Sequence, residues 1–354
     1  MCFTILAQVQ RSLQHSSPQP TLAIPFTPKG ILSDGKAFPK SIFEWIDLAS
    51  RFVSSEDKPA AQLLPIVLRL VKLSARVHSQ PLMDGDPQTA NVIHEVLQLD
   101  DALAAWEDQV RTHNTNTNTN GNDSTTNTNI WTVTEDLLSN YAPSPTADPV
   151  PPQAVFDGAY HVYSDMFVAR TWNHYRWARI LTCQMLLEAA FRFPMTNTTS
   201  FPNALISPAR IQSSLTVISR LARDILVSTP SHYRHPSLRP KHWACSIFDR
   251  THGGAVIGFA GVPTLLFEIK VAGCAPGVEA KCREWALGLL ETAWKDTGMG
   301  QARLLMEIVE GIVEGERRRS DMKNRMEGII PNGQGNGNGM GTQRGMGFAM
   351  LAVR

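Results

Sequence analysis

The segment 156–192, FDGAYHVYSDMFVARTWNHYRWARILTCQMLLEAAFR, constrains the fold of this chain more than any other. Its spacing predicts a helix with apolar or aromatic residues on almost every side, and such a helix must be covered by others. Arg170, Arg176 and Arg179 are set into that apolar surface. Because unpaired burial of a charge is costly, each guanidinium needs a partner. The segment therefore predicts the centre of a helical core that contains ion pairs.

The sequence offers partners for these arginines. Trp172 and Arg176 are four positions apart, which suits a cation–π contact on one face of a helix. The expected carboxylate partners are Asp165, Glu188 and, from the following helix, Asp224. We favour a structural ion-pair network that fixes the register of the helices; the alternative is an effector-binding pocket.

The rest of the chain predicts an all-α fold, a single domain of about eight to ten helices. Ser207 suits an N-cap and Pro208 the first helical position, while Pro194 and Pro230 are expected just beyond two helix ends. The glycine-rich segment 251–267 indicates either close helix packing or a broken helix. The predicted helices span residues 39–53, 60–78, 88–112, 131–140, 157–193, 207–228, 238–267, 276–295 and 299–326.

Composition sets the domain boundaries. Residues 1–37 form a loose leader and residues 38–327 the helical domain. Within it, 113–129 alternates Asn with Thr; this pattern cannot bury apolar surface and predicts a disordered insertion. Residues 143–152 are a proline-rich linker, and 328–354 are a Gly- and Asn-rich tail of low complexity.

Charge and cysteine usage exclude several functions. A net charge of +1 leaves no basic footprint for gripping DNA unaided. The five cysteines include no Cys-x-x-Cys pair, so no structural zinc cluster is expected, and reduced intracellular thiols fit better than disulfides. Arg69, Lys72 and Arg76 interrupt the apolar segment 60–77 at helical spacing, which indicates an amphipathic helix and not a membrane span.

Four acidic residues raise the possibility of a magnesium site. Asp101 and Asp108 are two helical turns apart, with Asp100 and Glu107 beside them. The second cluster of an all-α terpene cyclase is not evident, so we interpret the four as a solvated helix face. The opposite, buried stripe of this helix is predicted to contain Val92, Val96, Leu99, Leu103 and Trp106.

Other candidates for chemistry are weaker. His242, Cys245 and His252, with Cys274 or Cys282 as a fourth ligand, could form a zinc site, but buried cysteine beside tryptophan is the commoner arrangement. There is no Gly-x-Ser-x-Gly elbow for a nucleophile. The sequence thus predicts no catalytic, cofactor-binding or metal-binding residue.

The basic run 314–325, EGERRRSDMKNR, reads as a solvated helix end. The alternative is a weak nuclear-import signal or a contact to the DNA backbone. Its cations are interleaved with acids and are Arg317, Arg318, Arg319, Lys323 and Arg325.

One order of residues recurs in a known family. The central segment has a Trp, then Tyr-Arg, then Arg-Ile, at Trp172, Tyr175, Arg176, Arg179 and Ile180. Further matches, in the expected order, are Leu99-Asp100-Asp101-Ala102-Leu103 with Trp106, Ala222-Arg223-Asp224-Ile225 with Thr229-Pro230, and Gly298-Met299-Gly300-Gln301-Ala302. Over residues 39–312 this pattern resembles the central regulatory region of fungal binuclear zinc-cluster transcription factors.

The resemblance implies a nuclear domain that regulates transcription through protein partners, as a homo- or heterodimer or by contacting the transcription machinery. The six-cysteine DNA-binding module of that family is not in this sequence, so it would lie upstream of Met1 or be lost from this paralogue. Direct DNA binding and membrane binding are not expected. One alternative is an all-α enzyme of terpene-cyclase type, to be tested at Asp101 and Asp108; another is a helical scaffold that sequesters a full-length paralogue.

Overall fold

The computed structural model describes residues 53–54, 57–79, 86–112, 130–137, 155–192, 206–232 and 265–328. Within these residues the fold is helical apart from one two-stranded hairpin, as the all-α prediction requires. Its elements are α4 (Lys58–Ser79), α5 (Pro87–Thr112), β1 (Thr134–Leu137), the 3-10 helix η4 (Phe156–Gly158), β2 (Ala159–Val162), α6 (Met166–Arg192), α7 (Pro208–His232), α9 (Leu266–Cys274), α10 (Ala280–Thr297) and α11 (Gly300–Gly328).

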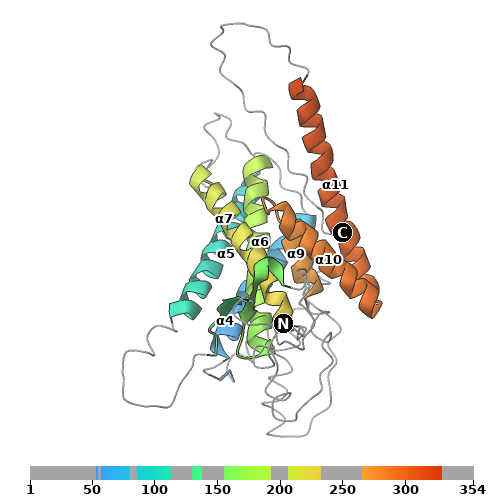
Figure 1. The fold of residues 1–354 in the computed structure, drawn as a ribbon. Helices are drawn as coiled ribbons and strands as arrows, with labels where there is room; N and C mark the ends of the chain where they lie inside the picture. Colours follow the sequence, from blue (N-terminus) through green and yellow to red (C-terminus); the bar gives the residue numbers. More distant parts are fainter. Residues whose placement is uncertain are drawn as a thin grey trace, which may run out of the picture.

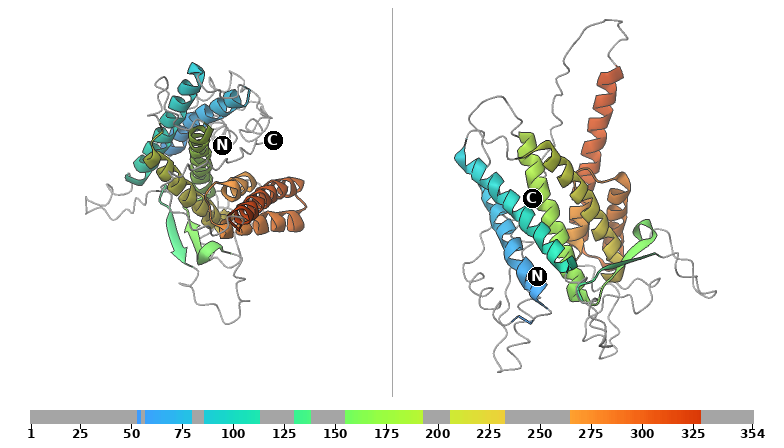
Figure 2. Two further views of the ribbon diagram at one scale, coloured as in Figure 1. Left: turned by 90° about the horizontal axis from the view of Figure 1, so that it is seen from above. Right: turned by 90° about the vertical axis from the view of Figure 1, so that its left-hand side faces the viewer.

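Helix α6 is the centre of this arrangement. It packs against α4, α5, α7 and α9, while α9, α10 and α11 pack against one another on one side (Figure 1). Tyr175, Trp177 and Ile180 of α6 are completely buried. The predicted central helix is therefore confirmed. Figure 2 shows α11 at the outer edge of the group, with its C-terminal part extending beyond the other helices.

Local sequence signals define the helix starts. The Ser207 hydroxyl accepts the backbone N–H of Arg210 at 3.2 Å, and Pro208 is the first helical residue, as predicted. In the same way Asp86 Oδ1 accepts the N–H of Gln88 at 2.9 Å, where α5 begins. These caps satisfy backbone donors that have no partner within the helix.

The helix predicted at 131–140 is wrong. Residues 134–137 form strand β1, which pairs antiparallel with β2, so that Thr134 lies opposite Val162 and Leu137 opposite Ala159. The run Thr132-Val133-Thr134 is β-branched and prefers extended backbone. These residues become a strand because they pair with β2, more than 20 residues later in the chain. The sequence near 131–140 does not indicate this partner.

The central helix also begins later than position 157. Asp157 and Gly158 have φ values of 52° and 68°. Two successive residues in the left-handed region cannot continue a right-handed helix. The chain instead turns through η4 into β2, and α6 begins only after Asp165, whose Oδ1 caps the N–H of Val168 at 2.9 Å.

Two predicted helix ends are also corrected. Helix α7 continues through Pro230 to His232. Proline cannot donate to the carbonyl of Leu226, but the Thr229 hydroxyl does so in its place, which lets the helix continue. Helix α9 extends to Cys274 and does not end at 267. The rest of the predicted helix 238–267, and 39–52, lie outside the described residues.

The last two predicted helices are confirmed with small shifts. Helix α10 begins at Ala280 and not at 276, because Gly277 is in the left-handed region with φ 73°. Gly298, also left-handed, ends α10 by donating its N–H to the Trp294 carbonyl at 2.9 Å, and α11 follows at Gly300.

A glycine sets how closely the three C-terminal helices pack. A Cβ added at Gly273 of α9 would lie 3.0 Å from Ala286 Cβ of α10 and 3.2 Å from Val309 Cγ1 of α11. Any larger residue would push these helices apart. Gly273 therefore fixes the junction of α9, α10 and α11.

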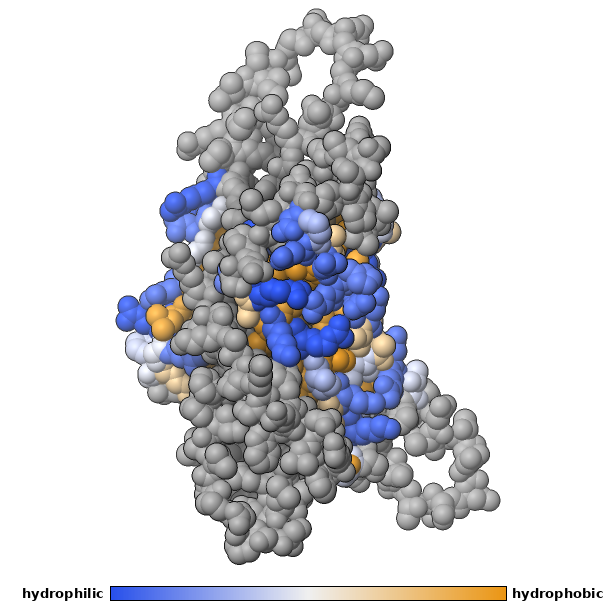
Figure 3. Space-filling view, turned by 180° about the vertical axis from the view of Figure 1, so that it is seen from behind, coloured by the Kyte–Doolittle hydropathy of each residue, from blue (hydrophilic) through white to orange (hydrophobic). Residues whose placement is uncertain are grey.

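On the back face, hydrophilic side chains cover much of the described surface and apolar ones show between them (Figure 3). No described helix combines the length and the apolarity that crossing a bilayer would require. The predicted leader 1–37, insertion 113–129, linker 143–152 and tail from 329 onward fall outside the described ranges.

Candidate functional site

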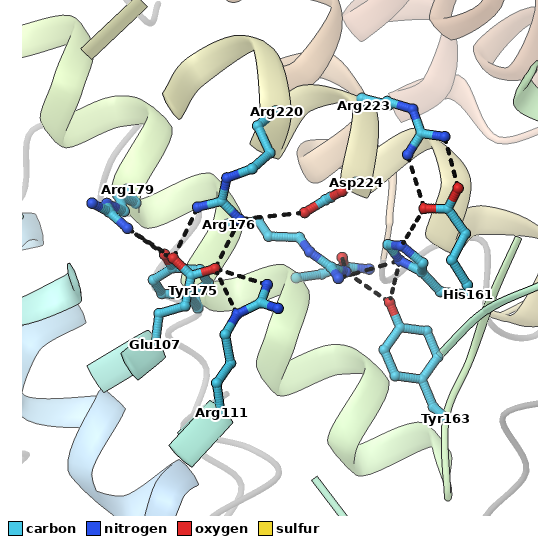
Figure 4. A network of polar contacts seen from close by, with 12 residues as sticks. Glu107, Arg111, His161, Tyr163, Tyr175, Arg176, Arg179, Arg220, Arg223 and Asp224 are labelled. Atoms are coloured by element: carbon cyan, nitrogen blue, oxygen red, sulfur yellow. Dashed lines mark hydrogen bonds and ion pairs between the residues drawn. The ribbon is translucent and has the colours of Figure 1, made fainter. Parts of the chain in front are cut away.

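A buried carboxylate, Glu107 of α5, is the hub of a polar network between α5, α6 and α7 (Figure 4). Arg179 Nη1 donates to it at 2.9 Å, Arg220 forms two bonds of 2.8 and 2.9 Å, and Arg111 Nη2 donates at 3.0 Å. The Tyr175 hydroxyl also donates to Glu107. One carboxylate thus joins three helices through charge-assisted hydrogen bonds, which are the strong ones.

Asp100, which lies seven positions before Glu107 on α5, about two helical turns away, extends the network. Its Oδ1 accepts Arg179 Nε at 3.2 Å, and its Oδ2 accepts Arg210 Nη2. Arg179 therefore bridges two acids seven positions apart on α5. Arg210 also binds Asp101 Oδ1 at 2.8 Å, and Cys183 Sγ lies 3.7 Å from Asp100 Oδ1.

The interpretation of these acids as a solvated face is wrong for Asp100 and Glu107, each of which is only 5% exposed. Asp101 and Asp108 are exposed, as predicted. The predicted apolar stripe from Val92 to Trp106 is buried. The error has a physical cause: α5 packs on both α4 and α6, so that a flank beside the stripe is also covered.

The carboxylates predicted to pair with the central arginines are not their partners. Asp165 caps the start of α6, Glu188 pairs with Arg192, and Asp224 lies 3.8 Å from Arg220. The acids come instead from α5, because α5 crosses α6 at the level of Arg179. The expectation of ion pairs inside the core is confirmed, and its assignment of partners is corrected.

Arg176 is the centre of a second cluster, whose direct partners are neutral groups. Its Nη1 donates to the Tyr163 hydroxyl and to Asn173 Oδ1, both at 2.7 Å, and its Nη2 lies 3.2 Å from His161 Nδ1. The predicted contact with Trp172 is confirmed, with the guanidinium 5.8 Å from the ring centroid. Stacking and hydrogen bonds thus replace a carboxylate here.

This second cluster connects the hairpin to α7. Glu135 of β1 lies 3.7 Å from His161 and accepts two bonds of 2.9 Å from Arg223 of α7. On the other side, Asn173 donates to Ser228 at 2.9 Å and lies 3.3 Å from His232. The hairpin that the sequence did not predict is therefore held in place by polar contacts.

Arg170, the third arginine of α6, interacts electrostatically with Glu268 of α9. Burial lowers its pKa, and the charge of Glu268 acts in the opposite direction. Its Nε has no hydrogen-bond partner. Burial likewise lowers the pKa of nearby Lys270, whose ammonium lies 5.9 Å from the Phe267 ring centroid.

The environment suppresses reactivity in the network. Burial alone would raise the pKa of Glu107, but hydrogen bonds from Arg220 and Tyr175 and the charges of Arg220 and Arg111 outweigh it and lower the pKa to about 2. Burial, with the charge of Asp100, raises the pKa of the Cys183 thiol to about 12. At neutral pH the carboxylate is ionised and fully engaged, and the thiol stays protonated.

The histidines behave in the same way. Burial lowers the pKa of His232 to about 3, and the charges of Arg170 and Arg176 act in the same direction. Burial, reinforced by the charge of Arg176, holds the pKa of His161 well below its usual range. Both rings are therefore neutral in the folded protein at neutral pH.

Of the proposed zinc ligands, His242, Cys245 and His252 lie outside the described residues. Cys274 is partly buried and Cys282 is buried. Burial raises the pKa of Cys274 to about 11. In the described parts of the chain, no three or more His, Cys, Asp or Glu side chains are grouped so that they could hold a metal ion. Arg317 and Arg318 of the basic run are exposed, as predicted.

Sequence reasoning missed the outer members of the network. The burial of Glu107 could have been inferred from its position beside Trp106, because α5 is covered on more than one side. Arg210 and Arg220 resembled ordinary surface cations of an amphipathic helix, and nothing local distinguished them. His161 and Tyr163 fall within the predicted helix 157–193, whereas α6 begins only at Met166.

Comparison of the chain with protein-family models, with curated proteins and with solved structures finds no match.

Proposed function

We propose that this chain is the regulatory domain of a fungal transcription regulator, that it acts in the nucleus through protein–protein contacts, and that it does not itself bind DNA. The observation that carries the proposal is a set of contacts between residues that match the family's pattern. Trp106 packs against Trp172 and Tyr175 with ring centroids 5.2 and 5.0 Å apart, and Asp100 binds Arg179. Two of the matched segments thus contribute to one buried cluster, which supports the proposal.

The chemistry of the cluster favours binding over catalysis. The buried carboxylates Asp100 and Glu107 are engaged by guanidinium groups, and the thiol of Cys183 is protonated. Such a network sets the register of α5, α6 and α7 and gives partner proteins a rigid body to bind. A scaffold that sequesters a full-length paralogue would use the same property.

The test is a tethered reporter in a fungal host, with the full chain fused to an unrelated DNA-binding domain. The expected result is a several-fold change in transcription from the reporter, retained in Asp108→Asn, an exposed control, and lost in Glu107→Gln. Suppression of a full-length zinc-cluster regulator by excess untethered chain would instead support the sequestering form. A folded, nuclear chain with neither effect would contradict the proposal.

A further inference from the structure

The outer face of α11 carries two apolar side chains, one of them strongly exposed. Leu304 is 62% exposed, and Ile308, one turn further along the helix, is partly exposed. Gly311 and Gly315 follow at helical spacing on the same side. We define the α11 outer face by these four residues. It belongs to the N-terminal half of α11, the helix at the outer edge of the described group (Figure 2).

Contacts within the described residues do not explain one glycine of this face. A glycine in a helix interior costs about 1 kcal/mol relative to alanine. At Gly273 that cost is explained by the close approach of α10 and α11. At Gly311, an added Cβ would meet no described atom within 4 Å. A helix of another molecule that packs closely on this face would make use of the missing side chain.

The charges beside the α11 outer face favour a second copy of this chain as the molecule that binds it. Along one flank lie two exposed i,i+4 ion pairs, Arg303–Glu307 and Glu314–Arg318. An antiparallel copy of α11, crossing between Gly311 and Gly315, would bring Glu307 of each copy opposite Arg318 of the other. In a parallel two-fold pair this flank would face the opposite flank of the partner helix, so these charges would not meet. The flank is therefore complementary to itself in the antiparallel sense, as a two-fold interface requires.

We propose that the α11 outer face binds the same face of a second copy of this chain, antiparallel, about a two-fold axis between Gly311 and Gly315. One helix from each copy makes a small interface, so the dissociation constant is expected to be on the order of micromolar. The proposal does not depend on the regulatory function proposed above, since self-association is measured on the purified chain.

The test is sedimentation velocity of the full chain over the micromolar range, on wild type and charge-reversal variants. Wild type is expected to shift from monomer to dimer with concentration. Glu307→Arg turns both intermolecular pairs into like charges and is expected to weaken the dimer about tenfold. The double variant Glu307→Arg with Arg318→Glu restores opposite charges between the copies, and the dimer is expected to recover.

The double variant separates the interface from helix stability, because it breaks both i,i+4 pairs within α11, one more than Glu307→Arg does, and yet should restore the dimer. Arg317→Glu is the matched control: it reverses the neighbouring charge on the far side of the helix, and the dimer should persist. A monomer at every concentration would overturn the proposal. So would a dimer that Glu307→Arg leaves unchanged, a double variant as weak as the single one, or an equal loss in Arg317→Glu.

Discussion

Arg179 of α6 and Glu107 of α5 are 72 positions apart in the chain, and 2.9 Å separates Arg179 Nη1 from Glu107 Oε2 inside the core. The same guanidinium binds Asp100 through its Nε. Because both acids are only 5% exposed, this relationship fixes how far α5 can slide along α6. A slip of one residue would leave charged groups buried without partners.

Loss of the Glu107 carboxylate should destabilise the folded chain. Glu107→Gln leaves the buried Arg179 without one of its carboxylates and should lower the free energy of unfolding by about 3 kcal/mol. Asp108→Asn, the exposed neighbour, should change it by less than about 0.5 kcal/mol. Urea denaturation at neutral pH measures both. Equal effects would show that Glu107 does not serve as the hub.

A double-mutant cycle tests whether Glu107 and Arg179 act as a pair. Glu107→Gln and Arg179→Met should each destabilise strongly, and together they should cost less than their sum by about 1–3 kcal/mol. The reason is that the double variant leaves neither charge buried without its partner. Strict additivity of the two unfolding free energies would mean that the contact contributes nothing of its own.

Stability should fall on mild acidification because of His232. Its pKa is about 3 when folded and about 6.5 when unfolded, so between these values the unfolded chain binds an extra proton. His232→Gln should lower the slope of stability against pH by about 1.4 kcal/mol per unit between pH 6.5 and 4.5. Denaturation at a series of pH values measures it.

Below that window Glu107 should dominate. Its pKa is about 2 when folded, against 4.5 for the unfolded side chain. Its stabilising contribution is complete above pH 4.5 and is lost as the pH falls toward 2. Glu107→Gln should therefore be less sensitive than wild type to acid in this range. An identical pH dependence of the two proteins between pH 4.5 and 2 would contradict the assignment.

Arg176 and Arg303 offer a matched comparison, since each lies over a tryptophan ring. Arg176 is buried 5.8 Å from the Trp172 centroid, and Arg303 is 59% exposed, 5.9 Å from that of Trp294. Arg176→Lys loses two hydrogen bonds to Tyr163 and Asn173 and should cost about 2 kcal/mol. Arg303→Lys should cost less than about 0.5 kcal/mol. Thermal unfolding ranks the two variants.

The sequence predicts the long helices of this fold well. Helices α4, α5 and α11 begin and end within about two residues of the predicted positions, because each has an apolar stripe of helical period. Ser207 and Pro208 start α7 as expected, since capping is chemistry within one turn. Burial of the arginines on α6 also follows from its pattern alone.

What the sequence does not reveal depends on contacts between distant segments. Strand β1 exists because β2 pairs with it, and residues 134–137 alone do not specify that partner. The acids that bind Arg179 are Asp100 and Glu107, and finding them requires the crossing of α5 over α6. Glu188 and Asp224 were closer in sequence but lie elsewhere along the helices.

We propose that this chain regulates transcription through a folded helical domain. The most direct measurement is RNA sequencing of a deletion strain of the source organism, complemented with wild type, Glu107→Gln or Asp108→Asn. The account predicts a defined set of altered transcripts, restored by wild type and Asp108→Asn but not by Glu107→Gln. Unchanged transcripts, together with loss of a metabolite that Asp108→Asn fails to restore, would contradict it and favour an enzyme.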